Sequence, residues 1–127
     1  MNNIKLFQSK QIRSVWNEEE QQWYFSVIDV VGALTDSIDP SAYWRKLKQR
    51  LILEGNEPVT NCHRLKMQAA DGKMRLTDVA NTKDMLRIIQ SIPSHKAEPF
   101  KQWLAQVGSE RIAEIENPEL AQKRIRD

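Results

Sequence analysis

The stretch DPSAYWRKLKQRLIL, residues 39–53, constrains the fold most strongly, because local signals mark both ends of a helix around it. Asp39 suits the N-cap, where its carboxylate can accept a hydrogen bond from a free backbone amide, and Pro40 suits the first helical position. Gly55 can adopt the left-handed conformation that often ends a helix. We therefore predict a helix from about Pro40 to Leu53.

This predicted helix has two chemically different faces. At 100° per residue, Trp44, Leu47 and Leu51 form an apolar stripe with Tyr43 at its border. The two aromatic rings could stack on nucleic-acid bases, but their place on or beside the leucine stripe favours packing in a core. One helix can therefore pack into a core and still present positive charge to a partner. Its opposite side carries Ala42, Arg45, Lys46 and Gln49.

The region before this helix has a strand-like pattern. IRSVWNEEEQQWYFSV, residues 12–27, has alternating flanks around a polar centre and predicts a β-hairpin, to which IKLF, residues 4–7, can add a third strand. Ser26 and Asp29 have the spacing of a capping box, which predicts a first helix over VIDVVGAL. Gly32 either weakens this helix or lets another backbone approach closely. Two helices joined by a short turn have the outline of a helix-turn-helix.

A basic β-ribbon is predicted after a loop over GNEPVTN. In CHRLKMQAADGKMRLTDV, residues 62–79, Asp71-Gly72 stands between two strand-like runs, and a tight primed turn needs the positive φ that these two residues tolerate. Four positive charges on this hairpin predict a wing beside the basic helix. They belong to Arg64, Lys66, Lys73 and Arg75.

Helices are predicted for the remainder of the chain. Thr77 suits the cap of a helix over DVANTKDMLRIIQSI, which Pro93 ends. SHKAEPFKQWLAQVG has apolar residues at the i, i+3, i+4, i+7 spacing of a helix that Gly108 closes, and SERIAEI is expected to form another short helix. We assign residues 1–116 to one domain. Residues 117–127 are the expected start of a helix or a linker to a C-terminal region in a longer natural chain.

The predicted fold class is α+β, with an N-terminal β-hairpin or small antiparallel sheet, a helix-turn-helix-like pair, a β-ribbon wing and C-terminal helices. A chain of 127 residues with 40% hydrophobic content suits one small domain. The single Cys62 forms no internal disulfide, which fits a reducing compartment. No apolar run reaches the roughly 20 residues needed to span a bilayer. We therefore expect a cytoplasmic protein without a membrane partner.

Positive charge is concentrated in the middle of the chain. The formal net charge is only +2, but residues 42–103 hold twelve basic and six acidic side chains, whereas residues 1–41 hold three basic and six acidic ones. This asymmetry indicates a polyanion as partner. The same charges could instead serve only to keep one helix face in contact with water.

No group of residues has a catalytic spacing. Cys62 and His63 adjoin, but neighbours on a strand point to opposite faces, so a Cys–His dyad is not expected. His95 lies in a Pro-flanked linker and is interpreted as a solvated loop residue. The four glycines are scattered and form no phosphate-binding loop. We therefore predict a domain that is not an enzyme and has no catalytic residue, cofactor or metal.

Several long blocks of the sequence resemble one known family. They are WYFSVIDVVGALT, YWRKLKQRL, RLTDVA, LRIIQSIPS and AEPFKQWLAQVG. With their surroundings, from about Ile4 to Ile115, they resemble the Bro-N domain at the N-terminus of phage and prophage antirepressors, baculovirus Bro proteins and proteins similar to bacterial DNA-damage-inducible protein D. The resemblance implies an α+β DNA-binding domain joined to a variable C-terminal domain. For an antirepressor, it also implies interference with a phage repressor.

We predict that duplex DNA contacts the outer face of the second helix and the basic ribbon. Arg and Gln side chains can read guanine and adenine edges, and Lys side chains more often contact phosphates. A symmetric homodimer would suit a groove reader, although no segment requires one. The predicted DNA-binding residues are Ser41, Arg45, Lys46, Gln49, Arg64, Lys66, Lys73 and Arg75.

Two other function classes stay open on the sequence. A module that binds a phage repressor or another protein, without touching DNA, would expose Tyr43, Trp16 or Trp23 as an apolar patch. A nuclease or other DNA-modifying enzyme would need a metal-binding acidic cluster, which the fold alone could assemble. Salt separates the first class from DNA binding, because an apolar interface weakens little as salt rises and DNA binding weakens steeply.

Overall fold

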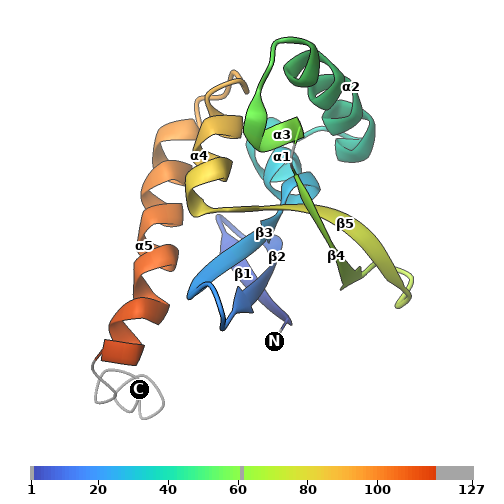
Figure 1. Ribbon diagram of the computed structural model, residues 1–127. Coiled ribbons are helices and arrows are strands. Elements are labelled where there is room, and N and C mark those ends of the chain that lie inside the picture. The colour runs from blue at the N-terminus through green and yellow to red at the C-terminus, as the bar shows by residue number, and fades with distance from the viewer. Residues whose placement is uncertain (1, 61, 117–127) are drawn as a thin grey trace.

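The computed structural model describes residues 2–60 and 62–116 of the 127-residue chain. It confirms the α+β class, because a five-stranded antiparallel sheet has helices packed mainly against one face (Figure 1). In space the strands follow the order β1-β2-β3-β5-β4. The strands are β1 Asn2–Phe7, β2 Lys10–Asn17, β3 Gln22–Ser26, β4 His63–Gln68 and β5 Met74–Asn81. The helices are α1 Val27–Thr35, α2 Pro40–Leu53, α3 Glu57–Thr60, α4 Thr82–Ile89 and α5 Ala97–Glu116.

The short central strand β3 pairs with only part of β5. It ends at Ser26 because α1 begins at the next residue, where the Ser26 hydroxyl accepts a hydrogen bond from the Asp29 amide at 3.3 Å. Residues 79–81 of β5 pair with β3, whereas residues 74–78 have only β4 as a strand neighbour within the described residues. We call β4, the following turn and residues 74–78 the ribbon. In Figure 1 it extends away from β1, β2 and β3.

Helices α1 and α2 form where the local signals predict them. The Asp39 carboxylate accepts a hydrogen bond from the Ala42 amide at 3.1 Å, Pro40 is the first residue of α2, and Gly55 has a φ of 80°. A Cβ atom placed on Gly32 would lie 3.2 Å from the Pro40 ring. Gly32 therefore lets the start of α2 approach α1 closely, although the group that approaches is a proline side chain and not backbone.

Strand alternation sends the side chains of the sheet to two separate clusters. Trp16 and Phe25 point to the helix side and join the main core with apolar residues of the helices. Tyr24, Met67 and Val79 form a smaller buried cluster on the opposite face. Both faces of the central strands therefore bury apolar groups, which stabilises the base from which the ribbon extends.

The prediction that Thr77 caps a helix is wrong. Strand β5 continues through Asn81, whose side chain caps α4 by accepting a hydrogen bond from the Asp84 amide at 2.8 Å. Thr77 is buried within this strand. Long-range pairing of β5 with β3 and β4 outweighs the local signal at Thr77, because β structure depends more on its neighbours than on local propensity.

Two further boundaries differ from the sequence prediction. Helix α5 continues through Gly108, where a stop and a separate short helix were expected. A glycine inside a helix costs only about 1 kcal/mol, so it does not by itself end one. The predicted loop after Gly55 contains α3, in which the buried Val59 donates its amide to the Asn56 side chain at 3.2 Å.

The expected start of a helix or linker at residues 117–127 lies outside the described residues. Among the helices that the structure does describe, none combines the length and the hydrophobicity that crossing a membrane requires.

Candidate nucleic-acid interface

Helix α2 separates its apolar and basic faces as the sequence predicts. Trp44 is 3% exposed and lies with Leu47 and Leu51 in the main core. Arg45 and Lys46 are exposed, and neither forms an ion pair with any residue that the structure describes. Their charges are therefore available to a negatively charged partner. The exposed face of α2 also carries the predicted polar residues Ser41 and Gln49.

Asp78 of β5 joins α2 to the ribbon. Its Oδ2 atom accepts hydrogen bonds from Trp44 Nε1 at 2.8 Å and from Lys48 Nζ at 2.9 Å. Its Oδ1 atom accepts one from Arg64 Nε at 3.2 Å. The Asp78 side chain is only 12% exposed, whereas that of Arg64 is 62% exposed. One partly buried carboxylate therefore holds two cations from two different elements.

The electrostatics of Asp78 favour its charged form. Burial raises the pKa of this carboxyl group, but the hydrogen bonds from Lys48 and Trp44 and the positive charge of Lys48 outweigh burial, so the pKa lies below its ordinary value. Because Asp78 stays ionised, its contacts with Lys48 and Arg64 are charge-assisted. Two cations around one carboxylate leave the group with a net positive charge.

The basic residues of the ribbon do not share one face. Arg64 lies opposite Asp78 and Lys66 opposite Leu76, so both point to the helix side of the sheet. Arg75 lies opposite Met67, which belongs to the cluster on the other face. Arg75 also donates to Asp71 Oδ2 at 2.6 Å. The structure therefore separates Arg75 from the other predicted DNA-binding residues.

The turn explains this separation. Within it, Ala69 donates to Lys73 O at 2.8 Å and Gly72 donates to Ala69 O at 2.9 Å, and of Asp71 and Gly72 only Gly72 has a positive φ. The loop thus has three residues, and not the two that Asp71-Gly72 predicts. One extra residue shifts the register by one position, which turns every side chain of the second strand to the opposite face.

The remaining residues are candidates for DNA contact on two elements, although Lys46, two positions before Lys48, lies on the side of α2 away from the ribbon. On α2, Arg45 is three positions before Lys48 and therefore lies on the side of the helix nearest to the ribbon. On β4, Lys66 is two positions beyond Arg64 and points to the same face, away from the Asp78 contact. We call this set the α2–ribbon surface, and Lys73, at the exposed end of the turn, is not part of it. Its residues are Ser41, Arg45, Lys46, Gln49, Arg64 and Lys66.

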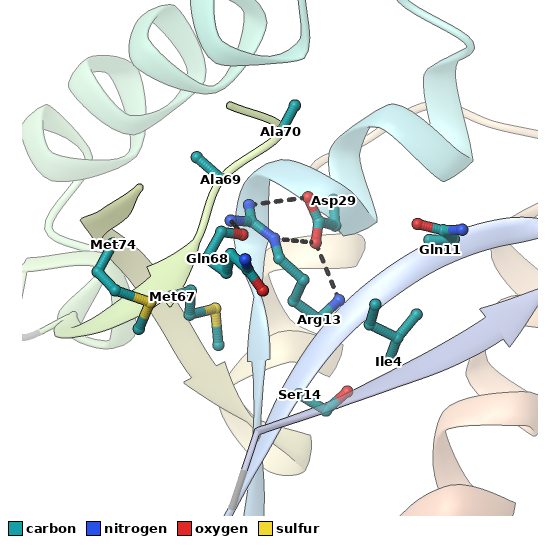
Figure 2. A pocket seen from close by; sticks show the side chains of 10 residues that line it. All are labelled: Ile4, Gln11, Arg13, Ser14, Asp29, Met67, Gln68, Ala69, Ala70 and Met74. Carbon is teal, nitrogen blue, oxygen red and sulfur yellow. Dashed lines mark hydrogen bonds and ion pairs between the residues drawn. The ribbon is translucent and has the colours of Figure 1, made fainter. Parts of the chain in front are cut away.

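An Arg–Asp pair that the sequence did not predict lies between β2 and the ribbon (Figure 2). Arg13 donates through Nε to Asp29 Oδ2 at 2.8 Å and through Nη2 to Oδ1 at 3.1 Å. Its Nη1 also donates to the Gln68 carbonyl at 3.1 Å, so it links β2, α1 and the ribbon. The Asp29 carboxylate thus bonds to Arg13, where the capping box predicts a bond back to the Ser26 amide. The signal for this pair was an arginine inside an otherwise alternating strand.

A cavity of about 540 Å³ opens beside this pair. Figure 2 shows side chains from β1, β2 and the ribbon around it, including Ile4, Met67 and Met74. Ile4 is 60% exposed and Met74 is 52% exposed, so apolar groups reach the solvent here. A protein-binding module was expected to show an apolar patch at Tyr43, Trp16 or Trp23 instead. The structure exposes no such patch at these three residues, because Trp16 and Trp23 are buried and Tyr43 is partly buried against the core.

The Cys62 thiol and the His63 imidazole interact with different groups. Cys62 donates through Sγ to the Val79 carbonyl at 3.2 Å, and burial raises the pKa of its thiol to about 11. His63 is exposed and stacks edge-on against Tyr24, with ring centroids 5.5 Å apart. His95 is exposed in the segment before α5. In the described part of the chain, no three His, Cys, Asp or Glu residues are grouped so that they could hold a metal ion.

The comparisons with known proteins identify one family. A model of the BRO family N-terminal domain, Bro-N, matches residues 11–109 and so covers the sheet apart from β1 and the first residue of β2, together with the α2–ribbon surface and most of the helical layer. No curated protein and no solved structure matches the chain. Because the matched residues make up most of the sequence, the chain belongs to the BRO family and carries its N-terminal domain, Bro-N.

Proposed function

We propose that this chain is the duplex DNA-binding domain of an antirepressor-like transcriptional regulator that acts in the cytoplasm. Membership of the BRO family supports the class of protein. The observation that carries the proposal is the outer face of α2, where Arg45 and Lys46 are exposed and unpaired among the described residues. A helix whose other face is held in the core can enter a groove without disturbing the fold.

In this proposal the two parts of the surface have different tasks. Arg45 and Gln49 would contact base edges in the major groove, since their side chains can form paired hydrogen bonds with guanine and adenine. Lys46 and Lys66 would contact phosphates and fix the orientation of the domain on the duplex. Arg64 stays mostly exposed while it bonds to Asp78, so it can still neutralise a nearby phosphate.

The test is the salt dependence of binding to duplexes selected from a random pool. Each neutralised phosphate contributes about 0.9 to the slope of log affinity against log salt, so the three cations assigned to phosphates, Lys46, Arg64 and Lys66, predict a slope of about −2.7. Affinity should then fall about 40-fold between 50 and 200 mM salt. Selection of no duplex, or a slope near zero, would contradict the proposal.

A second candidate function is protein binding, and the cavity between β1, β2 and the ribbon favours it. Ile4, Leu6, Met74 and Leu76 expose apolar surface on these strands, which is a common feature of protein interaction sites. A phage repressor is the partner that the antirepressor role would require. Binding of such a partner should change little between 50 and 200 mM salt, because an apolar contact is not screened by ions. The same titration therefore separates the two functions.

A further inference from the structure

Asp78 occupies the point where the ribbon leaves the sheet. The next three residues of β5 pair with β3, whereas residues 74–78 have only β4 beside them in the described structure. A two-stranded ribbon is marginally stable alone and twists more than a wide sheet does. Its position relative to α2 must therefore be fixed by side-chain contacts.

Asp78 makes these contacts in two directions. Trp44 and Lys48 reach it from successive turns of α2, and Arg64 reaches it from β4. Trp44 is buried in the main core, so its indole cannot follow the carboxylate if the ribbon moves. Asp78 is thus bonded to an immobile point of α2. A weaker, exposed contact at the end of β4, from Arg13 to the Gln68 carbonyl at 3.1 Å, supports the other end of the ribbon.

We propose that Asp78 is a positioning residue that fixes the distance and angle between α2 and the ribbon, so that both can contact one duplex at the same time. This proposal rests on the proposed DNA-binding function and adds a residue that does not itself touch DNA. Without Asp78, the ribbon would move relative to α2, and their relative position would have to be fixed at the moment of DNA binding. That ordering reduces affinity even when every contact residue is still present.

Charge and position make opposite predictions for this residue. Asp78 is a negative charge inside a surface that binds a polyanion, so its neutralisation should tighten DNA binding if charge alone matters. If Asp78 positions the ribbon, its neutralisation should weaken binding although the surface becomes more positive. The sign of the change therefore distinguishes the two roles.

The first experiment compares Asp78→Asn with Asp71→Asn in duplex binding at fixed salt. Both variants remove one negative charge from the ribbon, but Asp71 pairs with Arg75 on the other face and makes no bond to α2 among the described residues. We expect Asp78→Asn to weaken binding by about tenfold. Asp71→Asn should leave affinity unchanged or slightly increased. Equal tightening by both variants would overturn the proposed role in DNA binding.

The second experiment measures the position of the ribbon without DNA. Spin labels on Leu53→Cys and Ala70→Cys, in a Cys62→Ser background, report the distance between the end of α2 and the exposed turn of the ribbon. Asp78→Asn should broaden this distance distribution, and Asp71→Asn should leave it narrow. An unchanged distribution in Asp78→Asn would overturn the proposal whatever the affinity shows.

The two experiments separate this proposal from the proposed function. If the distribution broadens but the unsubstituted chain binds no duplex, Asp78 positions the ribbon and the DNA-binding function fails. Circular dichroism checks that each variant is folded. If Asp78→Asn does not fold, Lys48→Gln replaces it in the distance measurement, because it removes one α2 contact and keeps the Trp44 bond. Broadening in Lys48→Gln supports the proposal, and a narrow distribution contradicts it.

Discussion

Helix α2 and the ribbon are both basic, but they hold their positive charges differently. On α2, Arg45 and Lys46 face the solvent and are unpaired within the described residues, because a helix with one buried stripe has one outward side. On the ribbon, Arg64 and Arg75 pair with carboxylates and point to opposite faces. The charge of a helix face follows from residue spacing, whereas the charge of a ribbon face depends on register and on partners.

Replacement of the buried Trp44 tests how strongly the core anchors α2. Trp44→Ala removes a buried indole and its bond to Asp78, so we expect a loss of about 3–5 kcal/mol in the free energy of unfolding, measured by urea denaturation. Leu76→Ala on the ribbon is the matched control, because Leu76 is exposed and should change stability by about 0.5 kcal/mol or less. Equal losses in the two variants would contradict the difference between the anchored helix and the exposed ribbon.

Replacement of the two exposed cations Arg45 and Lys46 tests the proposed contact of α2 with DNA. Arg45→Ala with Lys46→Ala should reduce duplex affinity by about 10- to 100-fold at low salt, since one base contact and one phosphate contact are lost, and the lost phosphate contact should reduce the magnitude of the salt slope by about 0.9. Lys83→Ala with Arg87→Ala on α4 is the control, because it removes the same charge from another exposed helix. Unchanged affinity in the α2 variant, with an intact fold, would remove α2 from the site.

The two faces of the ribbon can be compared directly. Lys66→Ala should reduce the magnitude of the salt slope by about 0.9, because Lys66 is on the helix side and is unpaired in the described structure. Arg75→Ala should leave the slope unchanged, because Arg75 points away and pairs with Asp71. Fluorescence anisotropy titrations at several salt concentrations give both slopes. A larger effect of Arg75 would place DNA on the opposite face.

The smallest expected effect is the pH dependence of the contact that joins α2 and the ribbon. Burial raises the pKa of Asp78, but its hydrogen bonds with Lys48 and Trp44 lower it further, to below the ordinary value of 3.8. A carboxyl group with a lowered pKa in the folded state stabilises the fold above its unfolded pKa, and loses this effect as pH falls through the folded pKa.

Urea denaturation at pH 6, 4 and 3 can measure this contribution. The difference in stability between the unsubstituted chain and Asp78→Asn should be largest at pH 6 and should shrink toward pH 3, as Asp78 becomes neutral. A difference that does not change with pH would show that the charge of Asp78 contributes nothing to the contact.

Local signals predicted most elements but failed where distant residues decide. The start and end of α2 were correct because the Asp39 cap, Pro40, the apolar stripe and Gly55 agree with one another. The start of α4 was wrong because β5 is held by two other strands, which overrode the cap signal at Thr77. The helix stop at Gly108 was wrong because a single glycine is a weak signal.

For the candidate site, too, the sequence predicted what depends on local spacing and missed what depends on distant residues. The exposed residues of α2 were found from 100° periodicity, which needs only the helix itself. The placement of Arg75 was missed because a turn one residue longer reverses the face of the second strand. Asp78 was missed because its donors Trp44 and Lys48 are 34 and 30 residues away, and no spacing rule connects them.

The sequence by itself determined the α+β class, the start and end of α2 and the two faces of that helix, because each follows from contacts within a few residues. The tertiary structure alone decided which cations of the ribbon face α2, which of them pair with carboxylates, and where the ribbon lies. The physical reason is that strand register and long-range ion pairs depend on groups that become neighbours only when the chain folds.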